Sequence, residues 1–453
     1  MTTERRARFV GLLVLAILSL VAGAASGLVG AIFRVTLKKA DRARDAVITA
    51  GHDRGIAGFL LVCGGAAAAV ALAAWLVRRF SPYASGSGIP HVEAALNEEV
   101  PPTPPGLISV KFVGGVLAIG AGLALGREGP SVQMGAAIAH IVGRVCRRGW
   151  SDLRVLLAAG AGAGLATAFN APIAGAVFVL EELVGRFEAN IAISALGASA
   201  AAITVARALL GAAPDFDVEP LAYVGVGALP LFVLLGIAAG MAAALYNSLL
   251  LGTLAAMDRL SHWPVEMRTA VIGAAVGALA WFVPALVGGG DDITQRTLVG
   301  GATLSALSMA FLLRFGLGAI SYAAATPGGL FAPMLVLGTQ LGLFFSLLCR
   351  VAFPGMAVDT TAFAVVGMAA FFTGVVQAPV TGIALVIEMT ASFTMLLPML
   401  AACFAAMLVP NLLGSAPIYE SLRQRTARTA GVPARDARRS SIGFPPRGSK
   451  AGS

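Results

Sequence analysis

Charged residues are unusually scarce in this sequence. Asp, Glu, Lys and Arg make up 12% of the 453 residues, about half the share found in soluble globular proteins, whereas 58% of the chain is hydrophobic. A membrane-spanning helix needs about 20 apolar residues. The composition therefore excludes an ordinary soluble domain and predicts an all-α polytopic membrane protein. The runs without a charged residue are 9–33, 55–77, 155–180, 220–257, 269–290, 315–349, 360–387 and 389–419.

Residues for metal binding and covalent catalysis are also scarce. The four cysteines show no CxxC spacing, so we expect them to pack in the core rather than to form disulfides or a metal site. The hydrolase motifs HExxH and GxSxG are absent, and so is the GxxxxGK[ST] loop that would hold a nucleotide phosphate. We predict that the protein is not an enzyme and uses no cofactor and no metal.

The net charge of +9 comes largely from the two ends of the chain. Arg5, Arg6 and Arg8 precede the first apolar run and more arginines follow the last, so the positive-inside rule predicts that both termini are cytoplasmic. A basic run at 34–44 weakens this rule locally. The first apolar run is too long for a cleaved signal peptide. We expect a transmembrane domain over 1–430 and a disordered cytoplasmic tail over 431–453, with no binding of nucleic acid.

The sequence GREGP at 126–130 interrupts the apolar pattern with a charged pair, Arg127 and Glu128. The uncharged segments on either side, 112–126 and 129–143, cover roughly 22 Å each as helices, which is short of the roughly 30 Å apolar core of a bilayer. Glycine loosens the chain, and proline is favoured in the first turn of a helix. We therefore predict two partial helices that meet inside the membrane.

Similar motifs recur about 200 residues later. GREGPSVQMG at 126–135 matches GLFAPMLVLG at 329–338, and AFNAPIAGAVFVLEE at 168–182 matches GVVQAPVTGIALVIEM at 374–389. The matched prolines lie 203 residues apart in one pair (130 to 333) and 207 in the other (172 to 379). The offsets indicate an internal duplication, with halves at about 55–215 and 220–425. Chance similarity among Gly- and Ala-rich helices is the alternative. Broken helices in matching positions favour a transport site near the membrane midplane.

Three motifs share the form of a helix start: GSGIP at 86–90, GREGP, and GLFAP at 329–333. The first backbone N–H groups of a helix lack internal partners and carry partial positive charge, so such ends bind anions. The hydroxyl of Ser87 could donate to an anion, or it could cap the helix. Tyr419 could be a second donor, or a tyrosine of the membrane interface.

These motifs, in their order from about residue 6 to residue 425, resemble the signature sequences of the CLC family of chloride channels and proton-coupled chloride transporters. The resemblance implies a homodimer in which each subunit has its own pore. It implies an inverted repeat of about 18 tilted and partial helices whose N-termini meet at the midplane. Hydroxyls and backbone amides would bind chloride. The residues that the resemblance places on chloride are Ser87, Gly129, Leu330, Phe331 and Tyr419.

The resemblance is to bacterial-type members. Most eukaryotic members carry a CBS-domain pair after the pore, whereas only 34 residues follow Tyr419 here. A multi-pass protein of the cell inner membrane is implied, surrounded by the lipid bilayer and without nucleotide regulation through such domains. In having serine at position 87, the sequence resembles the chloride-preferring members. Its motifs differ from those of the fluoride exporters.

The glutamate of GREGP is the gate in the family that this sequence resembles, and Glu128 has the chemistry for that role. When ionised, it can occupy the site that chloride binds, and when protonated it loses that attraction and can swing away. Apolar surroundings favour the neutral form, so one side chain could exclude the anion and carry the proton. The alternative is a structural ion pair with Arg127, although adjacent helical residues point in different directions.

Glu182 is the second candidate for proton transfer. Antiporting members resemble one another in having glutamate here, as a relay on the cytoplasmic side, and many channel members do not. The alternative is an ordinary carboxylate at the membrane boundary. We interpret Glu181 and its repeat counterpart Glu388 in that way, as interfacial or packing groups.

Other charges next to apolar runs receive structural interpretations. Lys111 opens an apolar helix, and Glu93 is its possible partner. Arg314 lies between two apolar runs and has no assigned role.

The function predicted from these features is a chloride/proton antiporter, which exchanges chloride ions against protons. A passive voltage- or pH-gated chloride channel of the same fold is the alternative, and Glu182 is the residue that favours the antiporter. A cation-coupled symporter would need carbonyl and carboxylate cages rather than donor-rich helix starts. An intramembrane enzyme would need a nucleophile and a base, and no such constellation is recognisable.

Overall fold

The computed structural model describes residues 3–222, 225–300, 303–352 and 359–429, and side chains from residue 11 to residue 426 within those ranges. The tail predicted at 431–453 lies outside the described residues. In the described part, all regular structure is helical, with two isolated bridges and no strand. The all-α class is thus confirmed. Nine helices of this part are long and apolar enough to cross a membrane, as expected of a multi-pass membrane protein.

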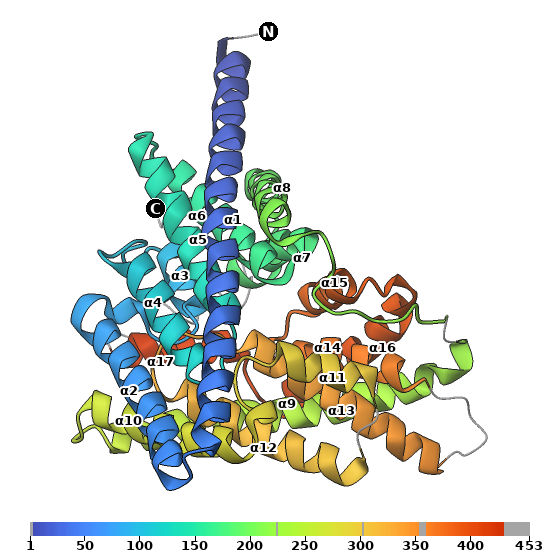
Figure 1. Ribbon diagram of the computed structural model, residues 1–453. Coiled ribbons are helices and arrows are strands. Elements are labelled where there is room, and N and C mark those ends of the chain that lie inside the picture. Colours follow the sequence, from blue (N-terminus) through green and yellow to red (C-terminus); the bar gives the residue numbers. More distant parts are fainter. Residues whose placement is uncertain (1–2, 223–224, 301–302, 353–358, 430–453) are drawn as a thin grey trace, which may run out of the picture.

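The helices follow one another along the chain, and a long connection over 211–228 leads from α8 to α9 (Figure 1). The first eight are α1 (Thr3–His52), α2 (Ile56–Phe80), α3 (Ile89–Leu96), α4 (Leu107–Gly120), α5 (Glu128–Val145), α6 (Trp150–Phe169), α7 (Pro172–Phe178) and α8 (Ala189–Leu210). The others in the described ranges are α9 (Leu229–Arg259), α10 (Val265–Phe282), α11 (Asp291–Val299), α12 (Leu304–Tyr322), α13 (Phe331–Ala352), α14 (Thr360–Val376), α15 (Pro379–Thr390), α16 (Leu396–Leu412) and α17 (Ile418–Thr429).

Helix packing repeats between α1–α8 and α9–α16. In the first set, α6 packs on α5 and α1, α8 packs on α1, and α4 packs on α5. In the second set, α14 packs on α13 and α9, α16 packs on α9, and α12 packs on α13. The two sets meet through α2 with α10 and through α7 with α15. We infer that the repeated unit includes α1, whose counterpart is α9.

Glycine allows the same close contact in both halves. A side chain at Gly160 of α6 would place its Cβ 2.3 Å from the carbonyl oxygen of Gly135 in α5. A side chain at Gly367 of α14 would place its Cβ 2.4 Å from the carbonyl oxygen of Gly338 in α13. Small residues let helices in membranes approach closely, and van der Waals packing then holds them together. The matched glycines at 135 and 338 therefore position the two broken-helix units alike.

Two partial helices are present as predicted, but the first ends at Gly120, before the residue 126 expected from the sequence. α4 ends at Gly120 and α5 begins at Glu128, so the segment between them is not helical. A helix of 14 residues such as α4 is about 21 Å long and one of 18 residues such as α5 about 27 Å, both shorter than an apolar core of roughly 30 Å. The irregular backbone between them is buried inside the protein, which is the condition under which such backbone is tolerated at membrane depth.

Candidate anion-binding site

The three motifs expected at helix starts meet in the structure. Gly126 and Gly329 exchange two backbone hydrogen bonds, with N···O distances of 2.8 Å and 2.6 Å. The N–H of Gly328 donates to the carbonyl of Gly86 at 3.1 Å, which adds the third motif. These bonds join residues from both halves of the chain. They bring the N-terminal ends of α3, α5 and α13 to one place.

Glycine leaves no room for side chains between these helix starts. A Cβ on Gly129 would lie 2.4 Å from the Ser87 hydroxyl oxygen and 2.5 Å from the Ser87 carbonyl oxygen. Neither α3 nor α5 has a side-chain cap on its first N–H groups. Leu330 is fully buried and directly precedes α13, whose first N–H groups also lack intrahelical acceptors. The junction therefore presents free donors without a lysine or arginine.

Two buried hydroxyls face this junction. The side chains of Ser87 and Tyr419 are fully buried, and both oxygens lack a hydrogen-bond partner among the described residues. No hydrogen bond joins the two hydroxyls to each other. The N-cap of α3 is Gly88, so the structure excludes Ser87 as the cap, and burial excludes Tyr419 as an interfacial tyrosine. An unsatisfied buried polar group costs about 1–3 kcal/mol, so two of them together fit a site built for an acceptor.

Aromatic rings enclose the site on the side of α13. The ring of Phe331 lies 5.9 Å from that of Tyr419, 4.8 Å from Phe372 and 5.8 Å from Phe178, measured between centroids. Phe331 is fully buried and is the first residue of α13. The apolar wall lowers the local dielectric, and this strengthens any interaction between an anion and the nearby donors.

Glu128 places its carboxylate between the starts of α5 and α13. The side chain is fully buried, and its Oε2 accepts a hydrogen bond from the N–H of Ala332 at 3.4 Å. Its Oε1 is buried without a partner among the described residues. The sequence motifs did not predict a role for Ala332, although it follows Phe331 in the same helix start and its N–H has no acceptor within the helix. The carboxylate therefore accepts a hydrogen bond from one free N–H of a helix start, as an anion could.

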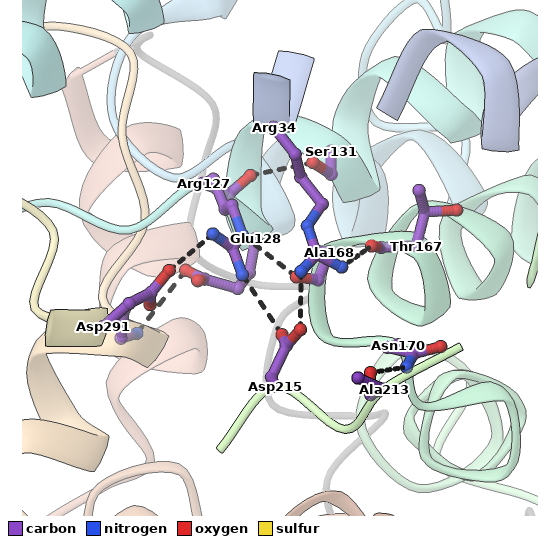
Figure 2. A network of polar contacts seen from close by, with 11 residues as sticks. Arg34, Arg127, Glu128, Ser131, Thr167, Ala168, Asn170, Ala213, Asp215 and Asp291 are labelled. Carbon is purple, nitrogen blue, oxygen red and sulfur yellow. Dashed lines mark hydrogen bonds and ion pairs between the residues drawn. The ribbon is translucent and has the colours of Figure 1, made fainter. Parts of the chain in front are cut away.

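Arg127 does not pair with Glu128. Figure 2 shows its guanidinium directed to Asp215, at 3.1 Å, and to Asp291, at 2.5 Å. Asp215 also bonds Arg34 of α1, at 2.5 Å. The alternative of a structural Arg127–Glu128 pair is thus wrong, because two carboxylates from distant segments hold the arginine. Neither aspartate carried a sequence motif that marked it.

Glu182 lies away from Glu128, in a π-helical turn (Val179–Leu183) after α7. It is partly buried and within electrostatic reach of Glu93 and Glu420. Such turns are frequent at functional sites because they redirect side chains. The structure thus groups Glu182 with other carboxylates, and it also lies within electrostatic reach of Tyr419 at the junction.

Glu181 and Glu388 have reciprocal structural roles. Glu181 accepts hydrogen bonds from the N–H groups of Val380 and Thr381 at the start of α15, at 3.1 Å and 2.6 Å. Glu388 accepts from the N–H groups of Ile173 and Ala174 at the start of α7, at 3.0 Å and 2.7 Å. Carboxylates stabilise helix N-termini. These glutamates therefore fasten α7 and α15 to each other.

Lys111 supports the loop that carries Ser87. Its ammonium donates to the carbonyls of Ala84 and Gly86, at 3.1 Å and 2.7 Å. The expected pairing with Glu93 is wrong, because that carboxylate pairs with Arg423 of α17. Carbonyl oxygens satisfy the buried cation where no carboxylate is within reach.

Arg314 has a comparable role in the other half. It donates to the carbonyls of Gly288 and Gly289, at 2.8 Å and 3.4 Å, in the loop before α11. That loop leads to Asp291, so Arg314 supports one of the partners of Arg127. Among the described residues, no group of three or more His, Cys, Asp or Glu side chains could hold a metal ion.

A cavity of about 530 Å³ leads to Glu128. The second half of α1 and the start of α11 line it, and Arg127, Glu128 and Ala332 are among its lining residues. The basic run at 34–44 therefore contributes to the wall of an opening to the site, mixed with carboxylates. The wall also carries five carboxylates, those of Asp41, Asp45, Glu128, Asp291 and Asp292, so the two signs balance. The basic residues of the wall are Lys38, Arg42, Arg44, Arg127 and Arg296.

Comparison with known proteins agrees with these features. Residues 68–411 match the family described as voltage gated chloride channel. The chain is 37% identical over 413 residues to the H(+)/Cl(-) exchange transporter ClcA of Salmonella typhi, covering 90% of this chain and 87% of the relative. It is 40% identical over 359 residues to ClcA of Cronobacter sakazakii, covering 78% and 77%.

A solved structure is similar over nearly the whole length. It belongs to a slow cyanobacterial Cl-/H+ antiporter, with a TM-score of 0.88 and 32% identity, and the match covers 92% of this chain and 99% of the other. The expected fold is thus confirmed. The chain belongs to the voltage gated chloride channel family, the CLC family of channels and transporters.

Proposed function

We propose that this protein exchanges chloride against protons across the membrane, with Glu128 as both gate and proton carrier. One observation carries the proposal: the Glu128 carboxylate lies on the N–H of Ala332, at the junction of helix starts where an anion would bind. The family, and the exchange activity named for its relatives, support the same function.

Chloride binds between three helix starts in this proposal. The hydroxyls of Ser87 and Tyr419 donate to it, and so do the backbone amides of Gly129, Leu330 and Phe331. Dipolar donors without a full positive charge hold an anion weakly enough for it to leave, which transport requires. The buried and unpartnered hydroxyls support this assignment.

The gate follows from the place of the Glu128 carboxylate at the same helix start. The ionised carboxylate accepts the Ala332 N–H, next to the amides of Leu330 and Phe331, and its negative charge excludes chloride. Once protonated, the carboxyl group is neutral and is no longer attracted to the helix start. It therefore releases the Ala332 N–H, and chloride takes its place. The proton leaves with the side chain, and Glu182 relays it on the other side of the site. The location of Glu182 among Glu93 and Glu420, within electrostatic reach of Tyr419, supports this relay.

We propose that both termini face the cytoplasm, that the protein resides in the cell inner membrane, and that two copies form a dimer. The basic run at 34–44 was the local exception to the positive-inside rule. This basic run lines the cavity at Glu128, and that role accounts for its charges. The predicted orientation of the termini can therefore stand. The cavity then faces outward, where anions arrive. The dimer rests on the family resemblance and is tested by cross-linking in membranes.

The test is a flux assay with purified protein in liposomes. A chloride gradient should drive protons uphill in the wild-type protein, because exchange couples the two ions. Glu128→Gln should keep chloride movement and lose proton movement, because the amide neither competes as an anion nor carries a proton. Glu266→Gln, which weakens an ion pair with the exposed Arg78, is the matched control. Chloride flux without proton movement in the wild type would instead identify a passive channel.

A further inference from the structure

Arg423 of α17 is a nearly buried cation that the proposed exchange does not use. Its side chain is 7% exposed and three carboxylates surround it. Its Nε lies 3.0 Å from Glu93, its Nη1 3.0 Å from Glu99, and its Nη2 2.7 Å from Glu420. Glu93 belongs to α3, Glu99 follows α3, and Glu420 belongs to α17. The guanidinium therefore ties α3 to α17.

The two helices that Arg423 joins begin at the anion site. Ser87 precedes α3, and Tyr419 lies in the first turn of α17. Tyr419 and Arg423 are four residues apart, so they share one face of α17 and lie about 6 Å apart along its axis. α3 and α17 also pack directly on each other. Any change in the spacing of these helices therefore changes the spacing of the two hydroxyls.

We propose that Arg423 is a positioning residue for coupled exchange. It holds α3 and α17 at the spacing that keeps Ser87 and Tyr419 together, so that chloride does not slip past them while Glu128 is in place. The inference rests on the proposed exchange function and assigns a residue to its control. It also explains why one arginine of α17 is buried among carboxylates.

Repulsion among the carboxylates explains why the cation matters. Without the guanidinium, Glu93, Glu99 and Glu420 would face one another with no counter-charge, in a site where Glu93 is 15% exposed and Glu420 23%. Removing one partner of a buried ion pair leaves uncompensated charge, whereas exposed pairs contribute little. The repulsion acts between α3 and α17, because the carboxylates lie on both helices. Loss of Arg423 therefore separates the helices.

The first test is Arg423→Met, which removes the charge and keeps much of the side-chain volume. We expect the number of chloride ions moved per proton to rise, with chloride flux retained. The expected rise is about twofold to thirtyfold, the range over which a residue that touches neither ligand alters coupling between two sites. Arg423→Lys should restore part of the coupling, since it keeps the charge. Arg78→Met is the matched control, because the Arg78–Glu266 pair joins α2 and α10 rather than α3 and α17.

A double variant tests whether Arg423 acts through Tyr419. If it does, Arg423→Met should change nothing further in a Tyr419→Ala background. Additive effects, or wild-type stoichiometry in Arg423→Met, would overturn the proposal. If Arg423→Met does not fold, Glu99→Gln removes the contact at the end of α3 instead and should raise the ratio likewise. If the wild type moves no protons, the proposed exchange fails, but the role of Arg423 in spacing α3 and α17 can still be tested. Arg423→Met should then raise passive chloride flux. An unchanged chloride flux would overturn the proposal.

Discussion

A methyl group at position 126 should open the gate. The Cβ of Gly126→Ala would lie 1.9 Å from Oε2 of Glu128, whereas ordinary contact begins at 3.4 Å. The backbone permits alanine, since Gly126 is not among the glycines with positive φ. The Cβ would also lie 3.1 Å from the backbone nitrogen of Ala332, which requires a shift of only a few tenths of an ångström. The flexible carboxylate is therefore the group that moves.

The size of the effect follows from that displacement. The carboxylate oxygen must move by about 1.5 Å, the difference between the two distances, and its hydrogen bond to Ala332 is already 3.4 Å long. A hydrogen bond to a charged group contributes about 1.5–3 kcal/mol net, so its loss lowers occupancy of the gate position by about tenfold to hundredfold. Chloride would then compete for donors that Glu128 no longer holds.

The assay compares chloride and proton flux in liposomes for the wild type, Gly126→Ala and Glu128→Gln. Gly126→Ala should keep chloride flux and lose most proton coupling, as is also expected of Glu128→Gln. Gly64→Ala in α2 is the matched control, because a Cβ there meets nothing within 4 Å. Wild-type stoichiometry in Gly126→Ala would refute the reasoning, since the carboxylate would then not rest beside Gly126. An added effect in the Gly126→Ala/Glu128→Gln double variant would also contradict it.

Three further variants test separate parts of the structure. Glu182→Gln should keep chloride flux and lose proton movement in the same liposome assay, whereas loss of both fluxes would indicate a structural role. Gly129→Ala should weaken chloride binding measured by calorimetry by about tenfold or more, because the new Cβ overlaps Ser87 at 2.4 Å, and unchanged affinity would remove this helix start from the site. Asp215→Ala leaves two guanidinium groups without their shared partner and should lower the free energy of unfolding by about 3–5 kcal/mol, measured as a drop in Tm in detergent; an unchanged Tm would show that the ion pairs contribute little.

Several functional residues could be found from the sequence because their signals are local. The glycines and prolines of GSGIP, GREGP and GLFAP mark helix starts, whose N–H groups are free wherever the helix packs. Glu128 stands inside such a motif, so its relation to the helix start follows from the chain itself. Phe331 occupies the matching position in the second half, which indicated that the fold does not require a carboxylate there.

The partners of other residues could not be predicted from the sequence, because these contacts depend on packing between distant segments. Arg127 precedes Glu128 directly, yet it bonds Asp215 and Asp291, which lie 88 and 164 residues away. Lys111 had Glu93 as a possible partner, but the carbonyls of the Ser87 loop lie within its reach. A pair of opposite charges in a sequence shows that both need partners, and only the arrangement of helices decides which partners they meet.

The sequence by itself determined the class of protein, the helix breaks, the duplication and the charged residue at the break, since apolar runs, glycine, proline and spacing act along the chain. Only the tertiary structure decided that the Glu128 carboxylate lies on the Ala332 amide, that two buried hydroxyls face the same junction, and that Arg423 ties together the helices that carry them. These contacts join helix ends more than 200 residues apart (128 to 332, and 87 to 419). Their geometry comes from close packing at glycine contacts such as Gly135 with Gly160, which no local pattern specifies.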